Sequence, residues 1–139
     1  MTTEPKWLVV ARKEIGTKEI PGPRSNPRVV QYYVGAVGKP QTDSVPWCAA
    51  FTGWCLVQAE KKSSGSLMAR SYAKYGDRCP AQPGAIAVWP RGRSPVLGHV
   101  NIVESVTGNK VVCIGGNQSD AVTRATYDKR RAVAFRWPK

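Results

Sequence analysis

The spacing of apolar residues changes partway along the chain, and this change limits the folds that the chain can adopt. Up to LMARSYAKYG (67–76) the apolar residues recur at helical intervals, whereas from AIAVW (85–89) onward they fall in short runs rich in β-branched and aromatic residues. Helices followed by a series of short strands are typical of an α+β domain. We therefore expect N-terminal helices packed on a C-terminal antiparallel β-sheet.

Two helices are predicted in the first part of the chain. Pro5 can occupy the first turn of a helix that runs to about Ile15, just before a glycine. Asn26-Pro27 supplies an N-cap and a first-turn proline for the apolar run that follows, which stops at Gly38. The segment between the two helices is rich in proline and glycine and is predicted to be a loop.

A third helix is predicted around the stretch VPWCAAFTGWCL. Asp43 or Ser44 can cap this helix, and Pro46 is tolerated in its first turn. Apolar residues continue at helical spacing up to Lys61-Lys62. Cys48 therefore falls in the first turn of this helix.

The second half of the chain is predicted to form strands. A short helical piece is expected first, near LMARSYAKYG. Gly108-Asn109 then marks a tight hairpin between two of the strands. The five predicted strands are AIAVW (85–89), HVNIVESV (99–106), KVVCIG (110–115), AVTRATY (121–127) and AVAFRW (132–137).

Length and composition indicate one domain, residues 1–139. A chain of 139 residues can bury a core without disulfides or metal. Its four cysteines show no CxxC pair and no zinc-ligand spacing, so we expect reduced thiols and no metal or other cofactor. The amino terminus, MTTEPKWLVVARKE, resembles neither a signal peptide nor a membrane span. We therefore expect a monomer that is made in the cytoplasm and does not insert into membranes.

The net charge narrows the choice of partners. The chain has 21 Lys and Arg residues against 9 Asp and Glu residues, a formal charge of +12 that concentrates polyanions around the molecule. Nucleic acid, cell-wall polymer and membrane lipid all fit such a surface. The basic residues are scattered in short groups, so no single stripe marks a nucleic-acid-binding face. A generally solvated basic surface explains the charge equally well.

Position distinguishes Cys48 from Cys55, Cys79 and Cys113. The first turn of a helix offers unpaired backbone N–H groups and the positive end of the helix dipole, which favour a thiolate. Cys55 lies two turns further along, where the dipole gives no help, and roughly 10.5 Å of helix rise puts it beyond disulfide reach of Cys48. Cys48 is therefore the candidate nucleophile, and Cys55 is predicted to be a core residue.

A cysteine nucleophile needs a base, and the chain has one histidine, His99. It opens a predicted strand, and the next strand ends in GGNQ, which returns Asn117 beside it as a group that could orient the imidazole. A plain two-residue turn at Gly108-Asn109 would put His99 and Asn117 on opposite faces. We therefore expect a bulge or a longer loop that lets both share a face with the start of the Cys48 helix.

These motifs together resemble a known family. PWCAAF at a helix start, GHVNIV opening a strand and GGNQ closing the next one are similar to the CHAP amidohydrolase/peptidases and the related NlpC-type peptidases. EIGTKEIPG, the Pro83-Gly84 turn and the closing FRWP extend the resemblance over nearly the whole chain. The resemblance implies a papain-like fold and a cysteine hydrolase that cuts peptidoglycan.

The resemblance also implies roles for particular residues. Cys48 would be the nucleophile, His99 the general base and Asn117 the orienting residue. Many CHAP members carry a carboxylate two residues before the asparagine, where this chain has a glycine. Glu104 and Asp120 are the nearby acidic alternatives to Asn117.

The implied reaction is acyl transfer through a thioester on Cys48. The N–H of Cys48 could be one oxyanion donor, while Gln41 and Asp43 are open choices for the second. The scissile bond is a muramoyl-alanine amide or a peptide bond of the stem or crosslink. A compact bacteriophage endolysin that acts on the wall after release is expected.

Three other hypotheses about the function stay open. One is a secreted antibacterial amidase toxin, which would share the chemistry of an endolysin. Another is a transferase that passes the acyl group to an amine. The third is a non-enzymatic basic module that binds cell wall or nucleic acid. We prefer the hypothesis of a peptidoglycan hydrolase without a nucleic-acid partner, because a binding module leaves Cys48, His99 and Asn117 unexplained.

Overall fold

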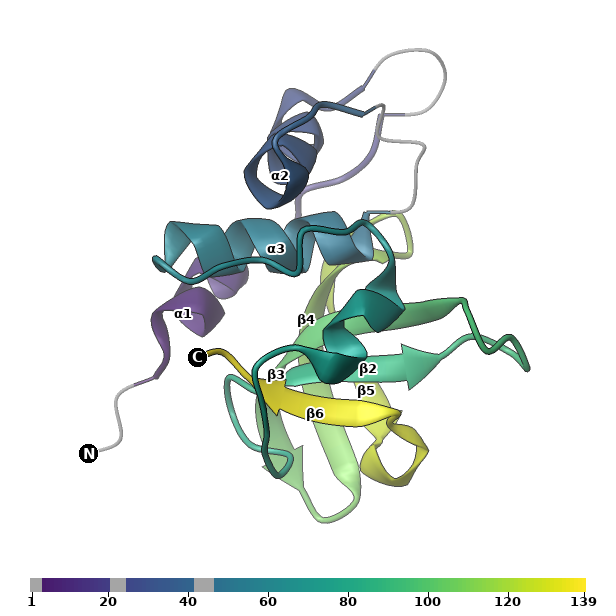
Figure 1. The fold of residues 1–139 in the computed structure, drawn as a ribbon. Coiled ribbons are helices and arrows are strands. Elements are labelled where there is room, and N and C mark those ends of the chain that lie inside the picture. Colours follow the sequence, from purple (N-terminus) through teal and green to yellow (C-terminus); the bar gives the residue numbers. More distant parts are fainter. Residues whose placement is uncertain (1–3, 21–24, 42–46) are drawn as a thin grey trace.

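The computed structural model describes residues 4–20, 25–41 and 47–139, and Figure 1 shows their arrangement. Three α-helices come first, and a 3-10 helix leads from them to a six-stranded sheet. The helices are α1 (Lys6–Lys13), α2 (Pro27–Val37), α3 (Cys48–Gln58) and the 3-10 helix η1 (Ala69–Lys74). The strands are β1 (Asp77–Arg78), β2 (Ile86–Pro90), β3 (Gly98–Thr107), β4 (Lys110–Gln118), β5 (Ala121–Asp128) and β6 (Ala134–Trp137), with a 3-10 turn, η2 (Lys129–Arg131), before β6.

The strands form one antiparallel sheet in the order β1-β6-β2-β3-β4-β5. The α+β class predicted from the sequence is confirmed, with helices first and the sheet after them. All five predicted strands are present. The two-residue strand β1 was not predicted, because its partner in the sheet, β6, lies almost 60 residues later in the chain.

The ends of the helices follow local signals. The Asn26 side chain accepts a hydrogen bond of 2.8 Å from the backbone N–H of Arg28, and Gly38 ends α2 with a φ of 78°, as predicted. Helix α3 ends at Gln58, earlier than expected, because Glu60 turns left-handed with a φ of 65°. The backbone N–H of the next residue, Lys61, then closes the helix on the Leu56 carbonyl at 2.8 Å.

Two other helix boundaries bear on the predictions. Helix α1 ends at Lys13, two residues before the expected end at Ile15. The suggested caps of α3, Asp43 and Ser44, and its first-turn proline, Pro46, lie outside the described residues. The first described residue at that end is Trp47, which is the N-cap of α3.

Helix α3 is the centre of the fold. Every residue from Cys48 to Leu56 is buried, as expected for a helix with neighbours on all sides. It packs against α1 and α2 and against the strands β3 and β4, so that it lies between α2 and the sheet, while α1 lies beside it and contacts the sheet directly (Figure 1). The opposite face of the sheet carries a second, smaller apolar cluster around Trp89, Val103 and Cys113.

The β3–β4 hairpin has the features that the sequence required. Thr107 pairs with Lys110 across the two-residue turn, as predicted. Val103 pairs with Cys113, but the next pair along β3 starts at Ser105, so Glu104 is an extra residue in β3. The expected bulge is therefore present. The His99 ring, however, lies beside Tyr127 on the face that carries Trp89, so the expectation that it shares a face with the start of α3 is not met.

Close contact between α3 and β4 depends on the glycine at position 116. A Cβ atom there would lie 2.6 Å from the Cβ of Phe51 and 2.7 Å from the ring of Trp47, which are contacts that no real side chain makes. Both of these residues are fully buried at the start of α3. Only a glycine at position 116 lets the helix start lie this near to the sheet.

We predict that Gly116→Ala lowers the free energy of unfolding by roughly 1–3 kcal/mol, because the added methyl group forces α3 away from β4. Denaturant unfolding followed by tryptophan fluorescence measures this change. Ser105→Ala is the matched control, since Ser105 is exposed on the same hairpin and its loss is expected to cost less than about 0.5 kcal/mol. Equal stability of the Gly116 variant and the wild type would contradict the close approach.

Candidate active site

Cys48 is the first residue of α3 and is almost buried, with 6% of its surface exposed. The N-cap residue, Trp47, provides no side-chain hydrogen bond to the first turn. The thiol lies close to the backbone N–H group of Val100 on β3 and to those of Ala49 and Cys48 in its own helix. The start of α3 is thereby joined to the strand that carries His99.

The ionisation of Cys48 differs from what the helix start alone predicts. Burial raises the pKa of the Cys48 thiol, and this effect exceeds the opposite effects of the Val100 and Ala49 N–H groups and of the Arg91 charge. The expectation that the thiolate is favoured was therefore wrong for the resting protein, because loss of water outweighs the helix end. Cys55 is fully buried with a pKa well above the ordinary value, which fits its predicted place in the core.

His99 lies near the beginning of β3, opposite Trp89 of β2, and is partly buried. Its Nε2 atom is 3.0 Å from the Oε1 atom of Gln118, and its ring lies roughly parallel to that of Tyr127, with 6.3 Å between centroids. Burial lowers the pKa of His99 below 6.5; the bond to Gln118 opposes this shift, and the Arg91 charge adds to it. The imidazole is therefore neutral at pH 7.

The residue that contacts His99 is Gln118 and not Asn117, the residue predicted from the sequence. The pairing of β4 with β5 shifts between Gly115 and Gln118, and Asn117 has a φ of 58°. This left-handed residue turns the backbone, so that the next side chain is buried and reaches the imidazole. Within the described part of the chain, the Asn117 side chain makes no hydrogen bond. Asparagine adopts positive φ more readily than most residues, and this is the sequence signal that could have pointed to its neighbour.

Cys48 and His99 belong to different elements, the start of α3 and the beginning of β3. The thiol lies against the backbone of Val100, which directly follows His99 on β3. No hydrogen bond links the thiol to the imidazole among the residues described. Contacts between catalytic groups are often long without substrate and shorten in the complex, so this geometry is compatible with proton transfer between them.

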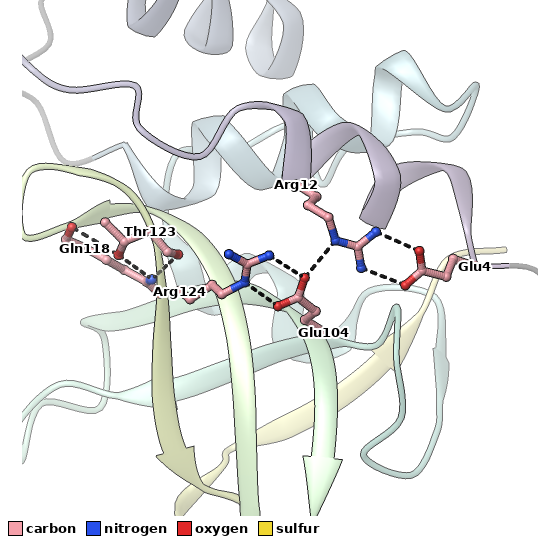
Figure 2. Close-up of polar contacts among 6 residues, drawn as sticks. All are labelled: Glu4, Arg12, Glu104, Gln118, Thr123 and Arg124. Carbon is pink, nitrogen blue, oxygen red and sulfur yellow. Dashed lines mark hydrogen bonds and ion pairs between the residues drawn. The ribbon is translucent and has the colours of Figure 1, made fainter.

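The acidic alternatives, Glu104 and Asp120, make no hydrogen bond to His99 within the described residues. Glu104 sits in the β3 bulge and binds Arg12 at 2.8 Å and Arg124 at 2.6 Å (Figure 2). Asp120 is exposed at the β4–β5 turn. Glu104 therefore links α1, β3 and β5 through its ion pairs. This structural role accounts for the residue without any contact to His99.

A groove opens beside Cys48, where a substrate could reach the thiol. Its walls are largely apolar, and three of its side chains are about half exposed: Met68 at 49%, Val96 at 53% and Leu97 at 54%. Arg91 adds one positive charge. The full set of lining residues is Cys48, Leu67, Met68, Ala69, Arg91, Val96, Leu97 and Gly98. Such a groove suits an extended chain with small apolar side chains and a carboxylate.

The described ranges contain neither a cluster of metal ligands nor a membrane-spanning helix. Among residues 4–20, 25–41 and 47–139, no three His, Cys, Asp or Glu side chains are grouped so that they could hold a metal ion. All four cysteines are free thiols. In the same ranges no helix has the length and apolar character needed to cross a membrane.

A helix that starts at a cysteine and packs on an antiparallel sheet with a histidine is the arrangement of papain-like cysteine hydrolases. The model of the CHAP domain family matches residues 40–117, more than half of the chain, and the chain belongs to this family. The family comprises cysteine- and histidine-dependent amidases and peptidases that act on peptidoglycan. The match includes the helix start, β2, β3 and most of β4.

A solved structure supports the same fold. The crystal structure of Ly7917 aligns with a TM-score of 0.59 and 16% sequence identity, over 99% of this chain. The chain spans 63% of Ly7917, less than two thirds of its length. At this identity the likeness shows the fold alone. Among curated proteins, no sequence matches the chain significantly.

We predict that Glu104→Gln lowers the free energy of unfolding by about 1 kcal/mol at pH 7 and leaves hydrolytic activity unchanged. The hydrogen bonds from Arg124 and Arg12 hold the pKa of Glu104 below its usual 4.5. The stabilisation is therefore present above pH 4.5 and is lost as the pH falls through the lower folded pKa. Unfolding curves at several pH values test this: the difference from the wild type should shrink on acidification. A large loss of activity would return Glu104 to the candidates for orienting His99.

Proposed function

We propose that the chain is a peptidoglycan hydrolase that cleaves an amide bond through a cysteine acyl-enzyme. The observation that carries this proposal is the placement of Cys48, whose thiol lies at a helix start against the residue next to the only histidine of the chain, beside an open groove. Membership of the CHAP family supports peptidoglycan as the substrate. The bond is a muramoyl-alanine amide or a peptide bond of the stem or crosslink.

The reaction starts from a neutral thiol and a neutral imidazole, because burial raises the pKa of Cys48 and lowers that of His99. His99 takes the thiol proton as the sulfur attacks the carbonyl carbon. Backbone N–H groups in the first turn of α3, including that of Cys48, stabilise the oxyanion. The amine leaves with the proton from His99, and a thioester remains. Water, deprotonated by His99, then releases the acid and restores the thiol.

The basic surface is proposed to hold the enzyme near the wall and to take no part in the chemistry. Peptidoglycan stems carry free carboxylates, and other wall polymers carry phosphates. A charge of +12 attracts both over long distances. Arg91 is the one lining residue of the groove that brings positive charge to the thiol itself, where it can meet a stem carboxylate.

We further propose that the biological role is that of a bacteriophage endolysin. The resemblance of this catalytic domain to compact endolysins supports the role. A secreted antibacterial amidase toxin would use the same chemistry. Production inside bacteria separates the two roles: an endolysin lyses its host once the inner membrane is permeabilised, whereas a toxin acts on neighbouring cells.

Cys48→Ala is predicted to lower the rate of peptidoglycan cleavage by roughly 10³-fold or more while the fold is kept, because the acyl-enzyme cannot form. Mass spectrometry of digested peptidoglycan measures the products and identifies the cleaved bond. Cys55→Ala is the matched control in the same helix and should keep its activity. Substantial cleavage by the Cys48 variant, or DNA binding without any cleavage by the wild type, would refute the proposal.

Lysis of intact walls is predicted to fall steeply as salt is raised, while cleavage of a small uncharged soluble amide changes little. The reason is screening, since the Debye length falls from roughly 30 Å at 0.01 M to about 8 Å at physiological ionic strength. Both substrates are measured across one salt series, with protein stability checked at each point. Equal salt sensitivity of the two reactions would show that charge acts at the active site itself.

A further inference from the structure

A row of hydrogen-bonded side chains lies behind His99, and we propose that it fixes which nitrogen of the imidazole carries the proton. The row runs from Trp89 through Asn101 and Gln118 to Thr123. The structure assigns Gln118 as a positioning residue that holds His99 with a proton on Nε2 and a free lone pair on Nδ1. This assignment rests on the proposed function, in which His99 is the general base.

The direction of the row is set at its first member. The indole Nε1 of Trp89 can only donate, and it lies 2.8 Å from Oδ1 of Asn101. The amide of Asn101 must therefore turn its Nδ2 the other way, where it donates to Oε1 of Gln118 at 3.0 Å. Both contacts are buried, so water does not offer a substitute partner.

The contacts of Gln118 with Thr123, at the other end of the row, require the same orientation of the Gln118 amide. Nε2 of Gln118 lies 2.8 Å from the main-chain carbonyl oxygen of Thr123, which can only accept (Figure 2). It also lies 3.2 Å from the hydroxyl oxygen of the same residue. Two independent partners, one at each end, thus place the Gln118 carbonyl oxygen toward His99.

The orientation of the Gln118 amide determines which nitrogen of His99 carries the proton. Oε1 of Gln118 is an acceptor without a proton, and it lies 3.0 Å from Nε2 of His99, so this nitrogen must be the donor. A neutral imidazole has one N–H group, and the lone pair is therefore on Nδ1. Nδ1 is then the atom that receives the proton of Cys48.

The space for the Gln118 amide is provided by a glycine. A Cβ atom at Gly115 would lie 2.6 Å from Oε1 of Gln118 and 2.7 Å from Cβ of Asn101. The left-handed backbone of Asn117, with its φ of 58°, carries the chain past this point. A side chain at position 115 and the amide of Gln118 therefore cannot occupy the site together.

Gln118 orients the imidazole without adding charge. Among the described residues, Arg91 after β2 is the charged group that acts on the ring, and Tyr127 of β5 lies beside it. Burial raises the pKa of Tyr127 to about 12, so its hydroxyl is neutral and donates to Oε1 of Gln118 at 3.3 Å. A carboxylate in place of this amide would add a negative group in contact with the ring, where the described residues place none.

Nuclear magnetic resonance of the whole chain tests the assignment without any substrate. The chain has one histidine, so long-range ¹H–¹⁵N spectra of protein labelled at histidine need no assignment. Neutral His99 of the wild type is expected as the Nε2–H tautomer. A proton on Nδ1, or an even mixture of tautomers, would overturn the proposal even if Cys48→Ala abolishes cleavage.

Two substitutions separate orientation from charge. Gln118→Glu keeps the acceptor and adds a negative charge, so the tautomer should stay the same while the pKa of His99 rises by about 1 unit or more. The acidic limb of kcat/KM should move to higher pH by the same amount. Gln118→Met removes the acceptor, and the Nε2–H tautomer should lose its excess while kcat falls roughly 10- to 100-fold with little change in KM.

The controls keep these outcomes apart from unfolding and from failure of the proposed function. Gln58→Met makes the same change at an exposed position of α3 and should alter neither the tautomer nor kcat. Unfolding curves show whether each variant is folded, and the wild-type and Gln118→Glu spectra decide the matter if Gln118→Met is not. An unchanged tautomer and kcat in folded Gln118→Met would overturn the assignment. Cleavage retained by Cys48→Ala would refute the proposed function alone.

Discussion

The contact between the start of α3 and the strand β4 is the constraint on which the rest of the structure depends. Trp47 and Phe51 lie on the backbone of Gly116 at distances that leave no room for a side chain. This contact brings the first turn of the central helix down to the sheet, and with it the thiol of Cys48 to the backbone of β3. The candidate site is thus a product of backbone packing.

The two adjacent glycines of β4 serve opposite faces of the sheet. Gly116 admits the helix on one face, and Gly115 admits the amide of Gln118 on the other. Because successive residues of a strand point to opposite faces, a pair of glycines is the shortest sequence that opens both sides at one place. The nucleophile and the group that orients the base therefore depend on neighbouring positions.

The sequence predicted those parts of the fold that local signals determine. The caps of α2 at Asn26 and Gly38 and the turn at Gly108-Asn109 each follow from a few adjacent residues. The need for a bulge in the hairpin followed from counting residues between His99 and Asn117. Cys48 and His99 could be selected because one was at a helix start and the other was the only histidine.

Other features depend on distant parts of the chain, and local signals do not reveal them. The choice of Gln118 over Asn117 depends on a shift in strand pairing and on a left-handed residue. The raised pKa of Cys48 depends on how completely α3 is buried, which no property of the helix itself determines.

The exclusion between a side chain at position 115 and the amide at position 118 has a consequence for how such a site can change over generations. Substitutions at these two positions are epistatic, because the effect of either one depends on the residue at the other. A carboxylate introduced at Gly115 would collide with Gln118, while loss of Gln118 alone would leave the histidine without an acceptor. A side chain at position 115 therefore requires a different residue at position 118 in the same protein.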